Sequence, residues 1–228
     1  MVAADEKVRV VVICGAGEKA FCAGSDISEF SKVLDGVVSK KLRRENAAFT
    51  AIERLPQPVI AAIHGVALGG GAEIALACDI RIIEADARIG FPEVNLGVFP
   101  GSGGVSRLPR VVGIGRAFEM LYTGEIMDAQ EAWRIGLVNR VVPAGECLAA
   151  ALRLAESIAA KPSLAVSLIR TGVHDSFSQN IDEATVRSLT DSEQVFSGPD
   201  ILEGIAAFFD KRPPVFTAGR QATRERTD

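Results

Sequence analysis

Hydrophobic positions in the first half of the chain form short continuous runs rather than helical stripes. Residues 8–14, 59–63 and 79–84 are rich in Val and Ile and are bounded by Gly, Pro or charged residues. Such short runs are typical of buried strands. A helical stretch at 39–54 separates the first two runs, and a short helix of small residues at 72–77 separates the last two. The order strand, helix, strand predicts a right-handed parallel crossover.

Beyond Gly113 the apolar positions change to helical spacing. We expect helices at 116–122, 128–135, 148–159, 163–174, 181–196 and 200–209, with a short strand at 137–142. Alternating elements followed by helices predict an α/β core with a helical C-terminal region. We place the core at residues 1–125 and the helical region at residues 126–228.

Composition limits the class of protein. The chain has 228 residues, 48% of them apolar and 24% charged, which fits one α/β domain or a core with a small appendage. Its 25 basic and 29 acidic side chains give a formal charge of −4 without a basic cluster, so no nucleic-acid partner is expected. No run reaches the roughly 18–20 apolar residues of a membrane span. The acidic start of the chain also lacks the pattern of a signal peptide.

Cysteine spacing bears on compartment and metal binding. Cys14, Cys22, Cys78 and Cys147 are far apart in the sequence. Structural zinc sites and disulfide frameworks usually contain closer pairs. We therefore expect free thiols, no metal site and a cytoplasmic location.

Three consecutive glycines at 69–71 precede the short helix. Without side chains, this turn permits close backbone approach and presents N–H groups at the positive end of a helix, where a developing oxyanion is stabilised. A tight turn packed against a neighbouring segment is the simpler alternative. Neither of the common glycine-rich phosphate-binding patterns is present.

Two acidic residues follow glycine- or proline-containing segments. Glu73 lies in the first turn of the short helix, where complementarity to the helix dipole would be sufficient reason for an acid. Glu93 follows Gly90-Phe91-Pro92 in a loop, where an acid is commonly just solvated. If folding brings the two together, they could position a water while one gives and the other takes a proton.

The segment 21–27 is a loop of small residues after the first strand. Ser25 or Asp26 could cap a helix, or the backbone N–H of Ser25 could be a second oxyanion donor. Cys22 is a possible nucleophile, but neither His64 nor His174 is visibly tied to it.

Several ordered motifs together resemble the enoyl-CoA hydratase (crotonase) family. They are AFCAGSDI at 20–27, PVIAAIHGVALGGGAE at 58–73, CDIR at 78–81, GFPE at 90–93, LGVFPGSGG at 96–104 and FFDKR at 208–212. The resemblance implies an α/β, crotonase-like spiral core of repeated ββα units with a helical C-terminal region. In this arrangement, residues 1–125 would carry the CoA and catalytic loops, and residues 126–228 would mediate oligomerisation.

The resemblance also implies a reaction. An enoyl-CoA hydratase adds water to the α,β double bond of an enoyl-CoA thioester and forms 3-hydroxyacyl-CoA. The backbone N–H groups of Ser25 and Gly70 would hold the thioester carbonyl as an enolate develops. Glu73 would orient and deprotonate the water, and Glu93 would protonate the α-carbon.

Substrate and partner contacts follow from the same resemblance. The expected contacts to the CoA thioester are Cys22, Ala23, Gly24, Asp26, Ile27, Gly69, Pro100 and Gly101. Phe208 and Lys211 resemble a CoA-contacting pair supplied by a neighbouring subunit, in a homotrimer or a hexamer built as a dimer of trimers. CoA is then part of the substrate, with no permanently bound cofactor.

The chain opens close to the strand at 8–14, whereas members of the family usually begin with two further strands and a helix. We expect this shortened N-terminus to leave a strand edge uncovered, although the continuously apolar run at 8–14 predicts burial on both faces.

The nearest alternative to a hydratase is an enoyl-CoA isomerase or another crotonase-family acyl-CoA enzyme. Isomerases of the family commonly keep one acid, so two favour hydration. A catalytically silent assembly subunit is the alternative of another class.

Overall fold

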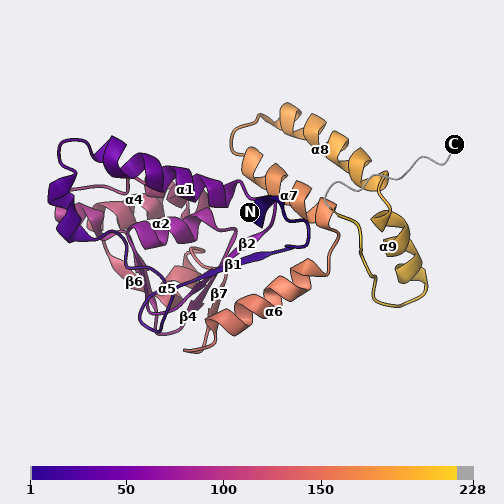
Figure 1. Ribbon diagram of the computed structural model, residues 1–228, viewed down its shortest axis with the longest axis horizontal. Coiled ribbons are helices and arrows are strands. Elements are labelled where there is room, and N and C mark those ends of the chain that lie inside the picture. Colours follow the sequence, from indigo (N-terminus) through magenta and orange to yellow (C-terminus); the bar gives the residue numbers. More distant parts are fainter. Residues whose placement is uncertain (1, 220–228) are drawn as a thin grey trace. The chain divides into compact units, whose positions relative to one another are not determined.

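A computed structural model describes residues 2–219 (Figure 1). The chain forms two compact units. One comprises Met1–Val11, Pro56–Pro58 and Leu154–Asp228, and the other comprises Val12–Leu55 and Val59–Arg153. Along the chain the units change at 11/12, 55/56, 58/59 and 153/154, the last of these within a helix. The division expected from helical spacing, at 125/126, stays a prediction. That division assigned an oligomerisation role to residues 126–228, and this role stays a prediction.

The main sheet has the strand order β1-β2-β4-β7. β2 (Val59–Ile63) pairs in parallel with β4 (Ile80–Glu84), and β4 pairs in parallel with β7 (Arg140–Val142). All five residues of β2 are fully buried, as expected for a central strand with both faces covered. The expected parallel crossover between β2 and β4 is confirmed.

β1 (Val11–Cys14) is the edge strand of this sheet and is shorter than the run at 8–14 predicts. Its first three residues are only half-buried, and Cys14 is exposed. The expectation that this strand is buried on both faces is therefore wrong. An edge strand has a pairing partner on one side only, so its apolar composition alone does not bury it.

A second, small sheet has the order β3-β5-β6. β3 (Val66–Leu68) is parallel to β5 (Arg88–Gly90), and β5 is antiparallel to β6 (Ile126–Asp128). The sequence pattern did not predict these strands, because three residues are too few to show a period. β3 and β5 each lie directly next to a segment that carries a predicted catalytic acid.

Helices surround the two sheets in this unit. They are the π-helical turn η3 (Val38–Leu42), α1 (Arg43–Glu53), α2 (Gly70–Ala77), α3 (Gly104–Val112), α4 (Ile114–Thr123), α5 (Ala129–Arg134) and the start of α6 (Cys147–Ala159). In Figure 1, α1 and α2 lie side by side. α3 was not predicted, because glycines precede it and Pro109 lies inside it.

The other unit contains α7 (Ser163–Asp175), α8 (Ile181–Phe196) and α9 (Asp200–Phe209). α8 and α9 begin and end at the residues that helical spacing predicts. Asn180 starts α8 with a capping box, in which its side chain accepts from the Glu183 N–H and the Glu183 carboxylate accepts from the Asn180 N–H. No helix within residues 2–219 is long and apolar enough to cross a membrane.

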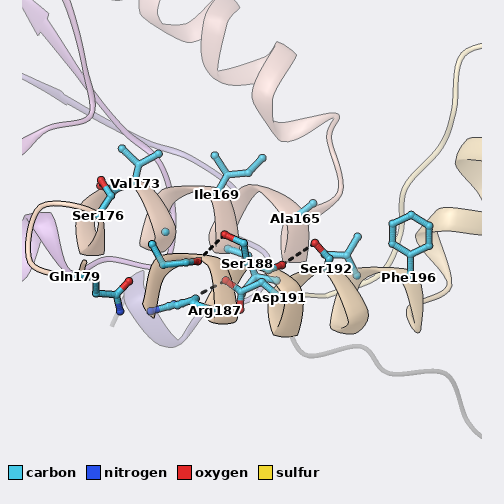
Figure 2. A pocket seen from close by; sticks show the side chains of 14 residues that line it. Ala165, Ile169, Val173, Ser176, Gln179, Arg187, Ser188, Asp191, Ser192 and Phe196 are labelled. Atoms are coloured by element: carbon cyan, nitrogen blue, oxygen red, sulfur yellow. Dashed lines mark hydrogen bonds and ion pairs between the residues drawn. The ribbon is translucent and has the colours of Figure 1, made fainter. Parts of the chain in front are cut away.

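An open groove of about 530 Å³ runs between α7 and α8 (Figure 2). Ile169 and Val173 of α7 and Phe196 of α8 line it and are 66%, 58% and 67% exposed. The hydrogen bonds of Ser188 and Ser192 run along α8 rather than across the groove. This surface is mainly apolar and is left uncovered by the described part of its own unit.

Candidate active site

The loop at 21–27 lies against the strand that leads into α2. The Cys22 N–H donates to the Val66 carbonyl at 3.1 Å, and the Leu68 N–H donates to the Cys22 carbonyl at 3.0 Å. A Cβ on Gly71 would lie 2.0 Å from the Cys22 carbonyl oxygen, so only glycine fits at this close approach. The requirement for glycine at position 71 is therefore steric.

This contact brings the two predicted oxyanion donors together. A Cβ on Gly70 would lie 3.8 Å from Gly24 Cα and 4.0 Å from the Ser25 hydroxyl oxygen. Gly70 is also the first residue of α2, whose N-terminal N–H groups are directed out of the helix. Ser25 and Gly70 thus lie in adjoining backbone segments.

Glu73 is buried in the first turn of α2, with only 3% of its surface exposed. Its Oε1 accepts hydrogen bonds from the Ser102 N–H at 2.9 Å and the Gly104 N–H at 2.8 Å. Burial raises the pKa of Glu73, and these two N–H donors oppose the rise. The nearby charge of Glu45 raises the pKa further, whereas that of Arg107 lowers it.

Glu93 lies in the 3-10 turn η4 (Pro92–Leu96), directly after the fully buried Phe91. Its Oε2 is buried and has no hydrogen-bond partner among the described residues. Burial raises the pKa of Glu93, its own backbone N–H lowers it, and the charge of Glu73 raises it. A Cβ on Gly69 would lie 3.3 Å from Glu93 Oε1, and the Gly69 carbonyl accepts from the Glu73 N–H at 3.0 Å, so folding brings the two acids near each other.

Gly69 connects the start of α2 with the segment that carries Glu93. Its φ of 53° is in the left-handed region, and a Cβ there would lie 3.3 Å from Glu93 Oε1. The Gly69 N–H donates to the Gly90 carbonyl at 3.0 Å, which ties the start of α2 to the segment carrying Glu93.

The two carboxyl groups have different partners. Two backbone donors favour the ionised form of Glu73. Glu93, by contrast, has a buried oxygen without a partner in the part of the chain that the structure describes, and it faces a neighbouring negative charge. Environments that differ in this way separate the roles of two acids. The arrangement therefore suits Glu73 as a proton acceptor and Glu93 as a proton donor.

The remaining predicted contacts in the first loop have varied environments. Cys22 is a free thiol whose backbone forms a β-bridge with Ala67. Gly24 has a φ of 90°, and a Cβ there would lie 2.7 Å from the Leu68 carbonyl oxygen. Asp26 is the N-cap of the 3-10 helix η2 (Ile27–Lys32), because it accepts from the Ser28 N–H. Ala23 and Ile27 are exposed.

Pro100 and Gly101 lie in the segment before α3. Pro100 is buried, and a Cβ on Gly104 would come within 2.6 Å of its Cβ. The Gly101 carbonyl accepts from the Asn46 amide at 2.9 Å. This packing sets the position of Gly104 and thereby of its bond to Glu73.

Phe208 and Lys211 belong to the other compact unit. Phe208 is 78% exposed at the end of α9 and stacks edge-on with Phe209. Lys211 has a φ of 52°, which is unusual for a residue with a side chain. Their expected contact with CoA in a neighbouring subunit stays a prediction.

Several residues near the acids were not predicted from the sequence. Ser102 is 2% exposed and supplies one of the N–H donors to Glu73, and its hydroxyl donates to Glu45 Oε2 at 2.7 Å. Lys41 donates to Glu45 and, at 2.6 Å, to the Ser25 hydroxyl. The only sequence signal was the glycine-rich stretch around Ser102, because Lys41 and Glu45 look like ordinary helix-surface charges.

An open groove of about 430 Å³ adjoins the Ser25 loop on this unit. Asp26, Phe30, Lys41, Glu45 and Phe49 contribute to its walls. Within residues 2–219, no group of three or more His, Cys, Asp or Glu side chains is arranged to hold a metal ion.

The fold identifies the class of protein. A solved enoyl-CoA hydratase from Bacillus anthracis superposes with a TM-score of 0.90 at 41% identity, over 94% of this chain and 83% of that structure. One from Geobacillus kaustophilus superposes with a TM-score of 0.87, also at 41% identity, over 94% and 82% of the two chains. The protein therefore has the crotonase fold, as expected from its motifs.

Sequence similarity then identifies the family. The sequence model of the enoyl-CoA hydratase/isomerase family matches residues 1–219, and the chain belongs to this family. It is 42% identical to a short-chain-enoyl-CoA hydratase of Clostridium acetobutylicum, over 91% of this chain and 80% of that protein. It is 41% identical to a crotonyl-CoA hydratase of Syntrophomonas wolfei, over 93% and 82% of the two proteins.

Proposed function

We propose that this protein is an enoyl-CoA hydratase, a hydro-lyase that adds water to an α,β-unsaturated acyl-CoA. The observation that carries the proposal is that the buried Glu73 and the half-buried Glu93, whose carboxyl groups have different hydrogen-bonding environments, lie beside the glycine-containing segments of Gly70 and Ser25. Relatives named as short-chain-enoyl-CoA and crotonyl-CoA hydratases agree with this reaction.

The proposed reaction moves one proton at each carboxyl group. Glu73, ionised, takes a proton from water as the water oxygen bonds to the β-carbon. The electron pair of the double bond moves toward the thioester carbonyl, whose oxygen accepts hydrogen bonds from the Ser25 and Gly70 N–H groups. Glu93, protonated, donates its proton to the α-carbon as the carbonyl re-forms. Transfer of the proton from Glu73 to Glu93 through a water then restores both groups.

The backbone N–H groups of Ser25 and Gly70 stabilise the negative charge that develops on the enolate oxygen. Loss of one donor of this kind costs about 2.7–4 kcal/mol of barrier in comparable oxyanion holes. The chemistry uses carboxyl and backbone N–H groups, and CoA enters and leaves with the substrate. We propose that the thioester binds along the groove beside Ser25 and Asp26, with Cys22, Gly24 and Gly69 shaping the backbone around it.

The test is hydration of crotonyl-CoA, followed as loss of the enoyl absorbance. We expect turnover with formation of 3-hydroxybutyryl-CoA. Conversion of a 3-enoyl-CoA without hydration would indicate an isomerase instead. Binding of crotonyl-CoA by calorimetry without turnover of either substrate would indicate a catalytically silent subunit.

We also propose that the protein assembles as a homotrimer or as a hexamer built from two trimers, through its helical C-terminal region. Large apolar side chains on α7, α8 and α9 support this, including Ile169, Leu189 and Phe196, which are 66%, 67% and 67% exposed. Burying each side chain of this size would contribute about 1.5–3 kcal/mol. Sedimentation of wild type and of Leu189→Asp tests the proposal, since a monomeric wild type would contradict it.

The location we propose is the cytoplasm, supported by four cysteines that are all free thiols. Fractionation of the source cells, with immunodetection of the protein, tests this location. Recovery of the protein in an oxidising compartment would contradict it.

A further inference from the structure

A chain of side chains joins the Ser25 loop to the segment that holds Glu73. The Lys41 ammonium donates to the Ser25 hydroxyl at 2.6 Å and also to Glu45 Oε1. The other carboxylate oxygen, Glu45 Oε2, accepts from the Ser102 hydroxyl at 2.7 Å. The Ser102 N–H donates to Glu73 Oε1 at 2.9 Å. One carboxylate therefore connects both sides of the site.

The Lys41–Glu45 pair differs from the helix-surface pairs of the same unit. Its side chains are 21% and 29% exposed, compared with 44% and 58% for Arg116–Glu119. Both Glu45 oxygens have partners, and one of these, Ser102, is almost completely buried. Exposed ion pairs commonly contribute little, whereas partly buried groups in a connected network hold each other in place.

The positions of the partners in the chain explain why such a link is useful. Lys41 and Glu45 lie on η3 and α1, Ser25 lies in the loop after β1, and Ser102 lies before α3. Backbone hydrogen bonds of Cys22 to Val66 and Leu68 hold the start of the Ser25 loop, whereas Ser25 itself and the segment 100–103 lie outside helices and strands. The side chains of Lys41, Glu45 and Ser102 add a direct link between these two segments. Misplacement of a reacting group by about 1 Å can cost roughly 10²-fold in rate.

We propose that Glu45 is a positioning residue for hydration, which sets the spacing between the Ser25 oxyanion loop and the base Glu73 through Lys41 and Ser102. The inference rests on the roles proposed above for Ser25 and Glu73. Glu45 does not touch the reacting atoms. It acts by holding two segments whose backbone N–H groups contact substrate and base.

The first test is Glu45→Ala, compared with Glu119→Ala as a control that removes an exposed ion-paired acid from α4. We expect kcat for crotonyl-CoA hydration to fall roughly tenfold to hundredfold in Glu45→Ala, with a much smaller change in KM. Glu119→Ala should keep the wild-type kcat. Glu45→Gln should recover part of the loss, because its amide oxygen and NH₂ group can still engage the network.

A double-variant cycle tests the route. Ser102→Ala removes the hydroxyl that contacts Glu45 but keeps the N–H that contacts Glu73. If Glu45 acts through Ser102, the double variant should be no slower than Glu45→Ala alone, within a factor of about two. Multiplicative losses would overturn the proposed route.

The dependence of kcat on pH distinguishes a specific role of Glu45 from a general loss of folded structure. The charged groups that face Glu73 are Glu45 and Glu93, which are negative when ionised, and Arg107. Glu45 raises the pKa of Glu73, so its removal should move the acid limb of the kcat profile to lower pH. A fold defect would lower kcat without moving this limb.

The outcomes are distinguishable from failure of the proposed function. If wild type does not hydrate crotonyl-CoA, the proposed function fails. If wild type is active and Glu45→Ala matches Glu119→Ala in kcat and pH profile, the positioning role is wrong. If Glu45→Ala does not fold, as judged by circular dichroism, the positioning role is tested with Glu45→Gln and Ser102→Ala instead. Wild-type kcat and pH profile in both would overturn the proposal.

Discussion

Replacement of Glu73 by Gln removes the proposed base while keeping its position. Gln has nearly the same shape as Glu. In the wild type, Glu73 Oε1 lies 2.9 Å from the Ser102 nitrogen and 2.8 Å from the Gly104 nitrogen, and the amide oxygen of Gln can accept the same two hydrogen bonds. The variant should therefore fold and bind crotonyl-CoA as wild type does. Only the ability to take a proton from water is lost.

The expected loss follows from general-base catalysis. Such a group contributes roughly 10²–10⁴-fold in rate. A loss of this size corresponds to about 2.7–5.4 kcal/mol of activation free energy. We expect kcat to fall by at least the lower value, with KM almost unchanged, in a crotonyl-CoA absorbance assay. Glu119→Gln, a matched change on the exposed face of α4, should keep wild-type activity.

The same variant has a stability signature. The pKa of Glu73 is raised from its ordinary value of 4.5, mainly by burial. The folded protein then holds this proton more tightly than the unfolded chain does. The contribution of Glu73 to the free energy of unfolding is fully present below pH 4.5 and is lost as the pH rises through the folded-state pKa. The free energy of unfolding of Glu73→Gln should therefore rise relative to wild type as pH increases, measured by urea unfolding.

Three results would contradict this reasoning. Turnover of Glu73→Gln within about threefold of wild type would exclude Glu73 as the base, since general bases contribute far more. A difference in unfolding free energy that is constant with pH would show that the carboxyl group is not protonated more readily in the folded state. Loss of substrate binding in this variant would indicate that Glu73 has a structural role instead.

Three further predictions concern other parts of the molecule. Glu93→Gln should lower hydration roughly 10²-fold or more while retaining crotonyl-CoA binding; near-wild-type turnover would contradict its role as the acid. Gly71→Ala should destabilise the protein by at least the upper end of the roughly 1–3 kcal/mol of overpacking, because its Cβ would meet the Cys22 carbonyl at 2.0 Å. Gly115→Ala, whose Cβ would meet nothing within 4 Å among residues 2–219, should be neutral or stabilising; thermal unfolding compares the two variants, and similar melting temperatures would refute the steric argument. Lys211→Ala should raise KM for crotonyl-CoA more at low salt than at high salt if Lys211 meets the CoA phosphates, whereas an unchanged KM at both would leave it a solvated surface charge.

The linear pattern determined those elements whose character is local. β2 is a continuous apolar run, and α8 and α9 have regular apolar spacing with clear ends, so the sequence predicts them almost residue for residue. The motifs around Gly69 and Phe91 likewise indicated which acids to consider. These features depend on side chains that are neighbours in sequence or on a single surface of one element.

Tertiary structure decided everything that depends on neighbours distant in the chain. β1 is half-exposed because it lies at a sheet edge, although its composition is that of a central strand. β3 and β5 are strands because β5 pairs with β3 on one side and with β6 on the other. Glu73 and Glu93 acquire raised pKa values through burial in one site, and Glu45 connects its two sides only through Lys41 and Ser102. Burial, pairing and convergence are long-range properties, and no local pattern carries them.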